Sequence, residues 1–505
     1  MIKSLRNIFS KPSSGAAKRS KAELAAAMAE LEAENAKLRF RLAESEVENL
    51  RLRKENDDLK AKITLNSGNS SNPPSSDGLR KKPVPSSLRK RTGRKSGGQM
   101  NHLGHNLNPK KVPDHIVDHK PKFCTCGCDL REVPMEQTAA RQVLDLPPPP
   151  PLDATEHRVY GGVCPKCGTK VAGQFPAGVD GPVQYGPRLS ALLIFLHGEQ
   201  YIPLERLTAT MSAMFNVSLG EGTIVNKMRK FAGLVKEPVE RIFELLAEGE
   251  LVHLDETGMR ASGSLHWLHV ASTRWLTYYH LHSKRGTDAF EGIGLIPLFK
   301  GKAVHDFWKS YFDYGDIIHC LCVAHLLREL KLAHEHYSQK WAERMIELLV
   351  EAHDACKEAR QAGMKNLAAA VLAKFKASYK AIVAAGKQEN NIRGGTIAVG
   401  KRGAPQTKPV NLLARFDIYD DAIFRFAEDL TVPFDNNQAE RDIRMAKLRQ
   451  KTSGTFRSKE NGKDFFMTRS YISTVKKQTG EIIDAIQSAF EGKPFMPEMA
   501  PANSI

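Results

Sequence analysis

The sequence lacks any apolar run long enough to cross a membrane and has few cysteines for its length. Its longest apolar stretch lies around Leu189 to Leu196, far short of the roughly 20 residues that a membrane-spanning helix needs. Eight cysteines in 505 residues are too few for a disulfide scaffold. We therefore expect neither a membrane protein nor a small disulfide-rich domain, and the clustering of the cysteines matters more than their number.

Acidic residues are also scarce relative to basic ones. There are 57 Asp and Glu against 74 Lys and Arg, which gives a formal net charge of +17, and this excess favours a polyanionic partner. Hydrophobic residues make up 41% of the chain and charged residues 26%, so most of it can bury a core. The length predicts several domains. The basic leader, residues 1–20, is interpreted as a disordered arm, with a targeting peptide as the alternative.

Residues 21–65 contain no Gly or Pro and carry leucines in a seven-residue register. The register is Leu24, Leu31, Leu38, Leu52 and Leu59, with Ser45 interrupting it. The second apolar position alternates between apolar residues and Asn, and Asn there fixes register and favours a parallel dimer. This pattern predicts a leucine-zipper-like coiled coil and a homo-oligomer, at least a dimer; a solitary amphipathic helix is the alternative.

Residues 66–108 are rich in Ser, Pro, Gly and Asn, which predicts a flexible basic linker. Twelve Lys or Arg occur between Arg80 and Lys122 against two acids. We expect Arg91, Arg94 and Lys95 to contact a phosphate backbone. A merely solubilising tether is the alternative.

Five cysteines fall in two short clusters within residues 109–175. They are Cys124, Cys126, Cys128, Cys164 and Cys167. Two turns that each supply two thiolates can bind one tetrahedral ion, so we predict a structural Zn²⁺ site formed by four of these five. Cys124 with either Cys126 or Cys128 forms the first pair. Redox pairing and a decayed site are the alternatives.

Residues 176–245 have helical apolar spacing. A helix Leu204–Phe215, a turn and a helix from Thr223 bearing Lys227 and Arg229 fit a helix-turn-helix. Ordinary core packing of two helices is the alternative.

Acidic side chains follow several predicted strands of residues 246–470. Three sequential strands beginning at ELVHLDETGMR predict an antiparallel meander, and Asp255 and Asp306 are each expected at a strand end. Strand alternation puts Glu256 on the face opposite Asp255. His253 and His305 are expected to face away from the neighbouring carboxylates.

A third acid, Glu440, shares a predicted helical face with Arg444 and Lys447. Such a constellation suits a divalent metal pair beside a phosphate backbone, although each acid alone is more typical of a surface charge or helix cap. Asp306 and Glu440 are 134 positions apart, which predicts a helical insertion at about 333–425. Residues 471–505 are predicted to be a C-terminal tail.

Four strings in this order, HLDETGMR, HDFWKSYF, HCLCVAHLLREL and PFDNNQAERDIR, resemble the DDE transposases of the insertion-sequence-66 family. The resemblance covers nearly the whole chain. It implies an RNase H-like core in which Asp255, Asp306 and Glu440 bind two Mg²⁺ or Mn²⁺ ions, and it selects Asp255 rather than Glu256. It also implies that Arg444 and Lys447 position the scissile backbone.

The resemblance implies supporting roles as well. Asn436 and Asn437 match the family motif and are expected to fix the geometry of the Glu440 helix. Cys322 and His325 resemble a CxxH element of other DDE families; they predict either a second metal site with His319 or a strand-to-helix junction. The first cysteine cluster departs from the family's CxxC spacing, which leaves its ligands open.

The sequence thus predicts a multidomain α+β protein with a coiled coil, a zinc module, a helical DNA-binding region and an RNase H-like core. We expect a DNA transposase that cleaves transposon ends and transfers the 3′-hydroxyl to target DNA, in the bacterial cytoplasm near the nucleoid. Small accessory transposition proteins are possible partners, and a membrane is not. A non-catalytic DNA-binding regulator, an inactive remnant and a resolvase-like nuclease are the alternatives.

Overall fold

The computed structural model describes residues 21–64, 108–146, 151–392 and 407–499. They form two compact units. The first contains the long N-terminal helix and the helices between positions 323 and 420; the second contains the cysteine segment, the sheet and the C-terminal helices. The predicted basic arm and the linker residues Arg91, Arg94 and Lys95 lie outside the described residues.

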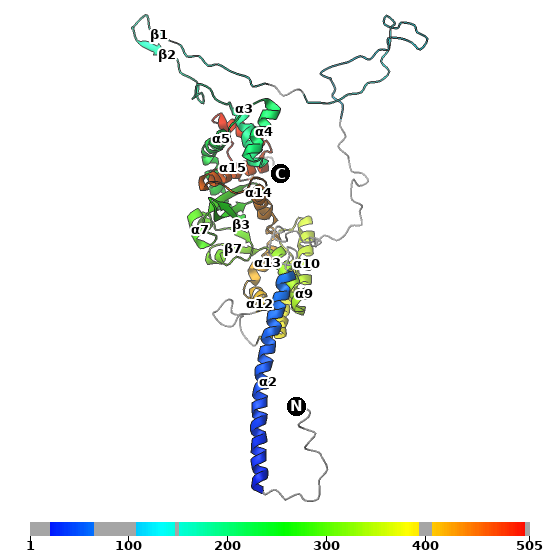
Figure 1. Cartoon of the computed structure of the whole chain (residues 1–505), viewed down its shortest axis with the longest axis vertical. Helices are drawn as coiled ribbons and strands as arrows, with labels where there is room; N and C mark the ends of the chain where they lie inside the picture. Colours follow the sequence, from blue (N-terminus) through cyan, green and yellow to red (C-terminus); the bar gives the residue numbers. More distant parts are fainter. Residues whose placement is uncertain (1–20, 65–107, 147–150, 393–406, 500–505) are drawn as a thin grey trace. The chain divides into compact units, whose positions relative to one another are not determined.

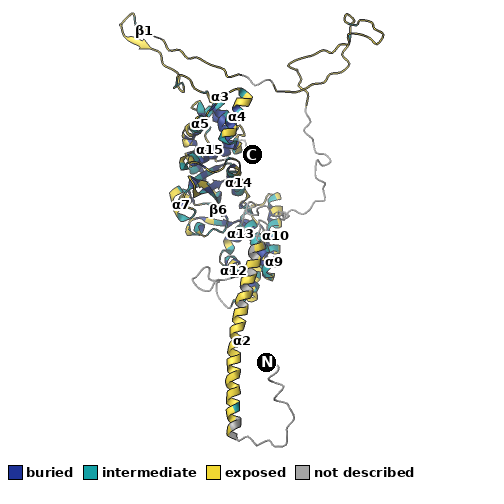
Figure 2. Cartoon of the chain, viewed as in Figure 1, coloured by how far each residue is buried: buried dark blue, intermediate teal, exposed yellow. Residues whose placement is uncertain are grey.

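Helix α2, Lys21–Thr64, is continuous over 44 residues. Its Ala, Glu, Leu, Lys and Arg residues have high helix propensity, and no Gly or Pro interrupts it. The apolar positions of the heptad lie on its exposed surface (Figure 2): they include Met28, Leu31, Leu38, Leu42, Leu52, Leu59 and Ile63. The predicted helix is confirmed, and its self-association stays a prediction.

The cysteine segment contains little regular structure. Strands β1, Gly161–Val163, and β2, Lys170–Ala172, pair antiparallel, and an isolated bridge joins Phe123 to Asp129. The described residues between 108 and 175 are nearly all exposed (Figure 2). Packing against a core therefore contributes little to the order of this segment.

The helical region that follows contains α3, Pro187–Ile194; η2, Phe195–Glu199; α4, Leu204–Phe215; α5, Glu221–Leu234; and α6, Lys236–Ala247. Helix α4 has the predicted bounds and ends at Asn216, whose φ of 52° is left-handed, a conformation that Asn tolerates. Leu207 and Met211 of α4 pack with Ile224 of α5 in a small buried cluster. The predicted helix pair is present, and reading of DNA by it stays a prediction.

A five-stranded mixed sheet forms the centre of the second unit, with strand order β5-β4-β3-β6-β7. The strands are β3, Leu251–Ala261; β4, Ser264–Ser272; β5, Thr277–His282; β6, Lys302–His305; and β7, Ile318–Leu321. The first three form the predicted antiparallel meander, and β6 and β7 are parallel to β3. The α+β class is confirmed.

Helices cover this sheet (Figure 1). After β5 come α7, Thr287–Ile293, and α8, Leu295–Leu298; the later helices are α13, Asp420–Glu428; α14, Asn437–Ser453; α15, Lys459–Gln478; and α16, Ile482–Phe490. The predicted start of the tail at 471 falls inside α15. That helix continues because Thr474 and Lys477 hydrogen-bond to β5 and to the turn before it, and Ile486 of α16 is fully buried.

The helical insertion forms much of the first unit. It comprises α9, Val323–Tyr337; α10, Lys340–Gln361; α11, Ala369–Glu389; and α12, Lys408–Ile418. Trp341 is buried against Phe416, and the Tyr379 hydroxyl donates to the Phe416 carbonyl. A Cβ at Gly386 would lie 2.9 Å from Cγ of Trp341, so only glycine lets these helices approach so closely. Among the described helices, none has the length and apolarity to cross a bilayer.

Candidate active site

Two of the predicted acids lie on adjacent parallel strands. The β3–β6 pairing ends at His253 and Val304, and two further residues in the same register bring Asp255 beside Asp306. Both side chains then lie on one face of the sheet. Asp255 lies in the interior of β3, which corrects the expectation of a strand end. The strand continues because β4 pairs with it as far as Ala261.

Glu440 lies in the first turn of α14, whose start is fixed by a buried asparagine. Asn436 is 1% exposed, and its Nδ2 donates to the Leu254 carbonyl at 2.7 Å. Its Oδ1 is 2.9 Å from Nδ1 of His253, and its backbone N–H donates to Sγ of Cys322 at 3.2 Å. Two contacts thus hold the start of α14 against β3, and the third holds it against the residue that follows β7.

The two histidines next to the acids behave differently. The expectation that His253 faces away from Asp255 is wrong, because residues two apart in a strand share a face and His253 contacts Asn436 at the start of α14. Burial lowers the pKa of His253, which the Asn436 contact partly offsets. His305 is fully buried and stacks on Tyr311 with ring centroids 4.5 Å apart.

The carboxylates influence one another electrostatically. Burial, followed by the charges of Glu256, Asp306 and Glu440, raises the pKa of Asp255 well above its ordinary value. A backbone N–H donated to Oδ1 of Asp255 at 2.8 Å offsets part of this effect. Carboxylates whose charges act on one another are stabilised by a shared cation. Oxygen ligands are those that Mg²⁺ prefers.

Glu256 is held inside the protein. Its side chain is 1% exposed, Tyr311 donates its hydroxyl to Oε2 at 2.6 Å, and Arg285 donates Nε to Oε1 at 2.9 Å. Burial, and then the charge of Asp306, raises the pKa of Glu256 to about 7, against the opposing effects of Arg285 and Tyr311. With both oxygens engaged, Glu256 is less suited than Asp255 to bind a metal ion.

One protein-family model, described as the Transposase IS66 family, matches residues 182–464. The match spans more than half of the 505 residues and includes all three acids. The chain belongs to the IS66 family of transposases. Membership implies DNA binding and the use of a divalent metal ion. A second model, a family of unknown function (DUF6444), matches residues 12–108, and no curated protein matches the chain.

The basic residues of α14 in this transposase differ in exposure. Arg444 is exposed, whereas Nζ of Lys447 donates to the Gly258 carbonyl of β3 at 2.5 Å. Burial lowers the pKa of Lys447. Arg449 is buried, with its guanidinium 3.6 Å from the centroid of the Phe456 ring. Of the two predicted backbone-contact residues on this helix, Arg444 is the more accessible.

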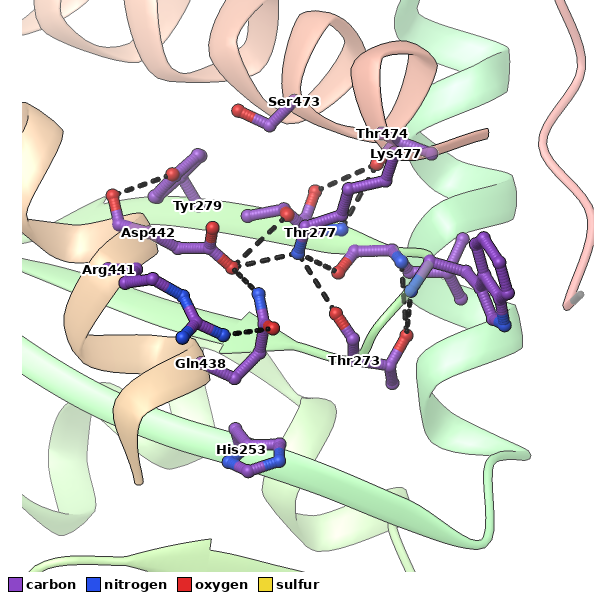
Figure 3. Close-up of polar contacts among 12 residues, drawn as sticks. His253, Thr273, Thr277, Tyr279, Gln438, Arg441, Asp442, Ser473, Thr474 and Lys477 are labelled. Carbon is purple, nitrogen blue, oxygen red and sulfur yellow. Dashed lines mark hydrogen bonds and ion pairs between the residues drawn. The ribbon is translucent and has the colours of Figure 1, made fainter. Parts of the chain in front are cut away.

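Asp442, two residues after Glu440, anchors the opposite flank of α14 (Figure 3). Its Oδ2 accepts hydrogen bonds from Nζ of Lys477 at 2.8 Å and from Nε2 of Gln438 at 3.0 Å. Its carbonyl accepts the Tyr279 hydroxyl at 2.9 Å. These contacts tie α14 to α15 and β5 and so fix the rotation of the helix that carries Glu440.

The remaining predicted supporting residues lie at the start of α14, in and after β7, and in α9, and Sγ of Cys322 lies within 4.8 Å of a carboxylate oxygen of Glu440. Asn437 is exposed and is the first residue of α14, and its backbone N–H donates to Oδ1 of Asp435 at 3.0 Å. Cys322 is buried directly after β7. His325 lies in the first turn of α9, and His319 hydrogen-bonds to His305 with 3.0 Å between ring nitrogens.

The five clustered cysteines lie in two separate turns of the transposase. Each turn has a left-handed glycine directly after a cysteine: Gly127, with φ 87°, follows Cys126, and Gly168, with φ 71°, follows Cys167. All five cysteines are free thiols. No group of three or more of them converges within the part of the chain that the structure describes.

No pattern in the sequence indicates the partners of Glu256. Arg285 lies 29 residues away along the chain, outside the four strings that resemble the family. Tyr311 lies 55 residues away, within the string HDFWKSYF, but the string does not pair it with Glu256. Only the fold brings them together, because β4 and β5 return the chain to the same end of β3.

Proposed function

We propose that this IS66-family protein is a DDE transposase that cleaves DNA at the ends of its element and joins the 3′-hydroxyl to target DNA. The observation that carries the proposal is that the charges of Asp306, directly after β6, and Glu440, in the first turn of α14, both act on the buried carboxyl of Asp255 on β3. The strand order, an antiparallel meander extended by two parallel strands, supports an RNase H-like core.

The three acids fit a divalent metal pair. Their oxygens suit Mg²⁺ or Mn²⁺, and the raised pKa of Asp255 reflects burial first and then the like charges around it, which a cation would compensate. Bound there, the metal ions would activate water or a 3′-hydroxyl and stabilise the charge on the phosphate. Asp255, Asp306 and Glu440 would together hold these ions.

The rest of the site holds these groups in place. Asn436 fixes Glu440 relative to β3, and Asp442 fixes the other flank of α14. Arg444, exposed on the same helix, contacts the DNA backbone, which positions the strand without reading its sequence. Lys447 supports the helix through its hydrogen bond to the Gly258 carbonyl. Its ammonium group contacts DNA only when that bond is broken.

The other segments serve assembly and DNA binding. Helix α2 forms a coiled-coil dimer through its exposed heptad face, and the linker arginines with Lys95 contact phosphates. The helix pair α4–α5 binds the element's ends. Small accessory proteins are further candidate partners, and the protein acts in the bacterial cytoplasm at the nucleoid.

A structural Zn²⁺ ion joins the two cysteine turns in this proposal. Hydrogen bonds from Cys126 lower the pKa of Cys124, and bonds from Thr169 and then Cys164 lower that of Cys167 to about 7. Thiols that ionise readily suit zinc. The equivalent glycine turns select Cys124, Cys126, Cys164 and Cys167 as ligands and leave Cys128 spare.

A non-catalytic DNA-binding regulator or inactive remnant is the second candidate. The basic charge and the helix pair serve either function. The buried contacts of Asn436 favour the enzyme, because they organise the start of the helix that carries Glu440, which binding alone does not need.

The test uses purified protein, labelled DNA with the element's ends and a supercoiled target. End cleavage and joining are expected with Mg²⁺ and are lost with EDTA and in Asp306→Asn, while DNA binding persists. Asp288→Asn, which changes an exposed acid of α7, serves as the matched control. Binding without cleavage under any metal, even with the element's other products added, favours the regulator.

A further inference from the structure

An arginine outside the predicted motifs is stacked between two tryptophans near the acidic cluster. Cζ of Arg285 lies 3.6 Å from the centroid of the Trp308 ring and 4.8 Å from that of Trp267. Contacts at these distances are favourable cation–π interactions. The Arg285 side chain nevertheless stays 27% exposed, so part of it faces solvent.

A buried carboxylate fixes this guanidinium from within. Nε and a terminal nitrogen of Arg285 lie 2.9 and 2.8 Å from Oε1 of Glu256. The second oxygen of Glu256 accepts the Tyr311 hydroxyl at 2.6 Å, so the carboxylate cannot rotate freely. The arginine is therefore held in one orientation before any ligand arrives.

The same contacts tie Arg285 to the acidic cluster. The backbone N–H of Trp308, the closer stacking partner, donates to Oδ1 of Asp306 at 3.1 Å. Glu256, the ionic partner, directly follows Asp255 in β3. Arg285 is thus linked through single residues to both strand-borne acids.

Arg285 has donors to spare. A guanidinium carries five N–H groups, and the contacts with Glu256 use two of them. The remaining three have no acceptor within the described ranges of the chain. A residue that only neutralised Glu256 would need neither stacking on two indole rings nor exposure to solvent. An arginine that binds an anion needs a fixed orientation and N–H groups that face solvent.

We propose that Arg285 binds a phosphate of the DNA strand held at the acidic cluster. Phosphate oxygens match the planar guanidinium in charge and geometry, and DNA is the phosphate source in the proposed function on which this inference rests. Arg285 acts as a positioning residue that sets the strand relative to Asp255 and Asp306.

The test measures affinity for duplex DNA carrying the element's end, in EDTA, over a range of salt concentrations. The main variant is Glu256→Gln with Arg285→Gln, which leaves no unpaired buried charge, and Glu256→Gln alone is its reference. We expect about tenfold weaker binding and a salt slope smaller by about 0.9, the loss of one phosphate contact. Arg285→Lys should keep the slope, because it keeps the charge, and should lose affinity about threefold, because it lacks the fork.

Arg274→Gln is the matched control. Arg274 is exposed and stacks on Trp275 at 4.7 Å, but it lies in the turn at the other end of the β4–β5 pair. Arg274→Gln should leave the salt slope and the affinity for DNA unchanged. Thermal unfolding confirms that each variant is folded.

If the double variant has the same salt slope and DNA affinity as Glu256→Gln, Arg285 does not bind a phosphate. If the parent protein cleaves DNA in the same experiments, that result rejects this inference and leaves the proposed function standing. A slope change in a protein that never cleaves supports Arg285 and rejects the proposed catalysis, and a protein that does not bind DNA rejects both.

Discussion

The sheet and the cysteine segment present their predicted metal ligands in opposite ways. Asp255 lies within a paired strand, and the start of the Glu440 helix is locked by Asn436, which is 1% exposed. In residues 108–175, none of the described residues is buried, and the cysteines lie in isolated turns. The comparison teaches that protein packing positions the three acids, whereas no buried contact orders the described residues of the cysteine segment, which under the zinc proposal would depend on the ion for its fold.

Removal of zinc is the strongest way to sharpen this comparison. Cys164→Ser with Cys167→Ser, or treatment with a chelator, should unfold the cysteine segment, because bound zinc supplies roughly 10–16 kcal/mol in small zinc domains. Limited proteolysis should then cleave within residues 108–175, while the thermal transition of the sheet is unchanged. Cys128→Ser is the control and should resist protease like the parent. Equal resistance in all of these proteins contradicts a zinc-dependent segment.

Asp255→Asn should reduce end cleavage by about 1,000-fold or more, since it removes a proposed metal ligand. The melting temperature should stay equal or rise, because the change relieves repulsion among buried carboxylates that raise the pKa of Asp255. Cleavage assays and calorimetry check the two parts. A large drop in melting temperature would show that the acid serves folding.

Asp442→Asn should lower the stability of the fold. The change breaks the contact with Lys477, whose side chain and that of Asp442 are 15% and 14% exposed. An unpaired buried charge costs about 3 kcal/mol, so urea unfolding should show a loss of this order. Asp288→Asn should show none. An unchanged free energy of unfolding for Asp442→Asn contradicts the anchoring role of this contact.

Glu256→Gln should alter the pH dependence of stability. The pKa of Glu256 is about 7 in the fold against an ordinary value of 4.5. The folded state therefore binds the proton more tightly, and its stabilisation is lost as pH rises from 4.5 through 7. The full pKa difference corresponds to roughly 3 kcal/mol, so across that window in EDTA the melting temperature of the variant should gain roughly 5–10 °C on the parent. If the melting temperatures of variant and parent change in parallel with pH, the raised pKa of Glu256 is contradicted.

Much of the fold could be predicted because its signals are local. The α2 helix follows from composition, the meander from three consecutive apolar strands, and α4 from its 3.6-residue spacing. Boundaries were less predictable: β3 runs past Asp255 because β4 pairs with it, and α15 runs past 470 because its residues bond to β5. Both depend on contacts with distant parts of the chain.

The site was predictable only in part for the same reason. Asp255, Asp306 and Glu440 were found through motifs that a family shares. The exposure of Arg444 against the burial of Lys447, three residues later, depends on how α14 rests on β3. Arg285 lies in none of the family strings, and the string that contains Tyr311 does not pair it with Glu256; only the return of the chain through β5 and β6 brings both to Glu256.

The most direct test of the central claim compares two changes on one helix, Glu440→Gln and Asp442→Asn. Cleavage of the element's end is measured with Mg²⁺, at saturating DNA and at a temperature where both proteins are folded. Glu440→Gln should lose about 1,000-fold in rate with its stability intact. Asp442→Asn should lose stability and a much smaller part of its rate, because it loosens α14 without removing one of the three acids. Parental cleavage by Glu440→Gln would contradict an active site built from these three acids.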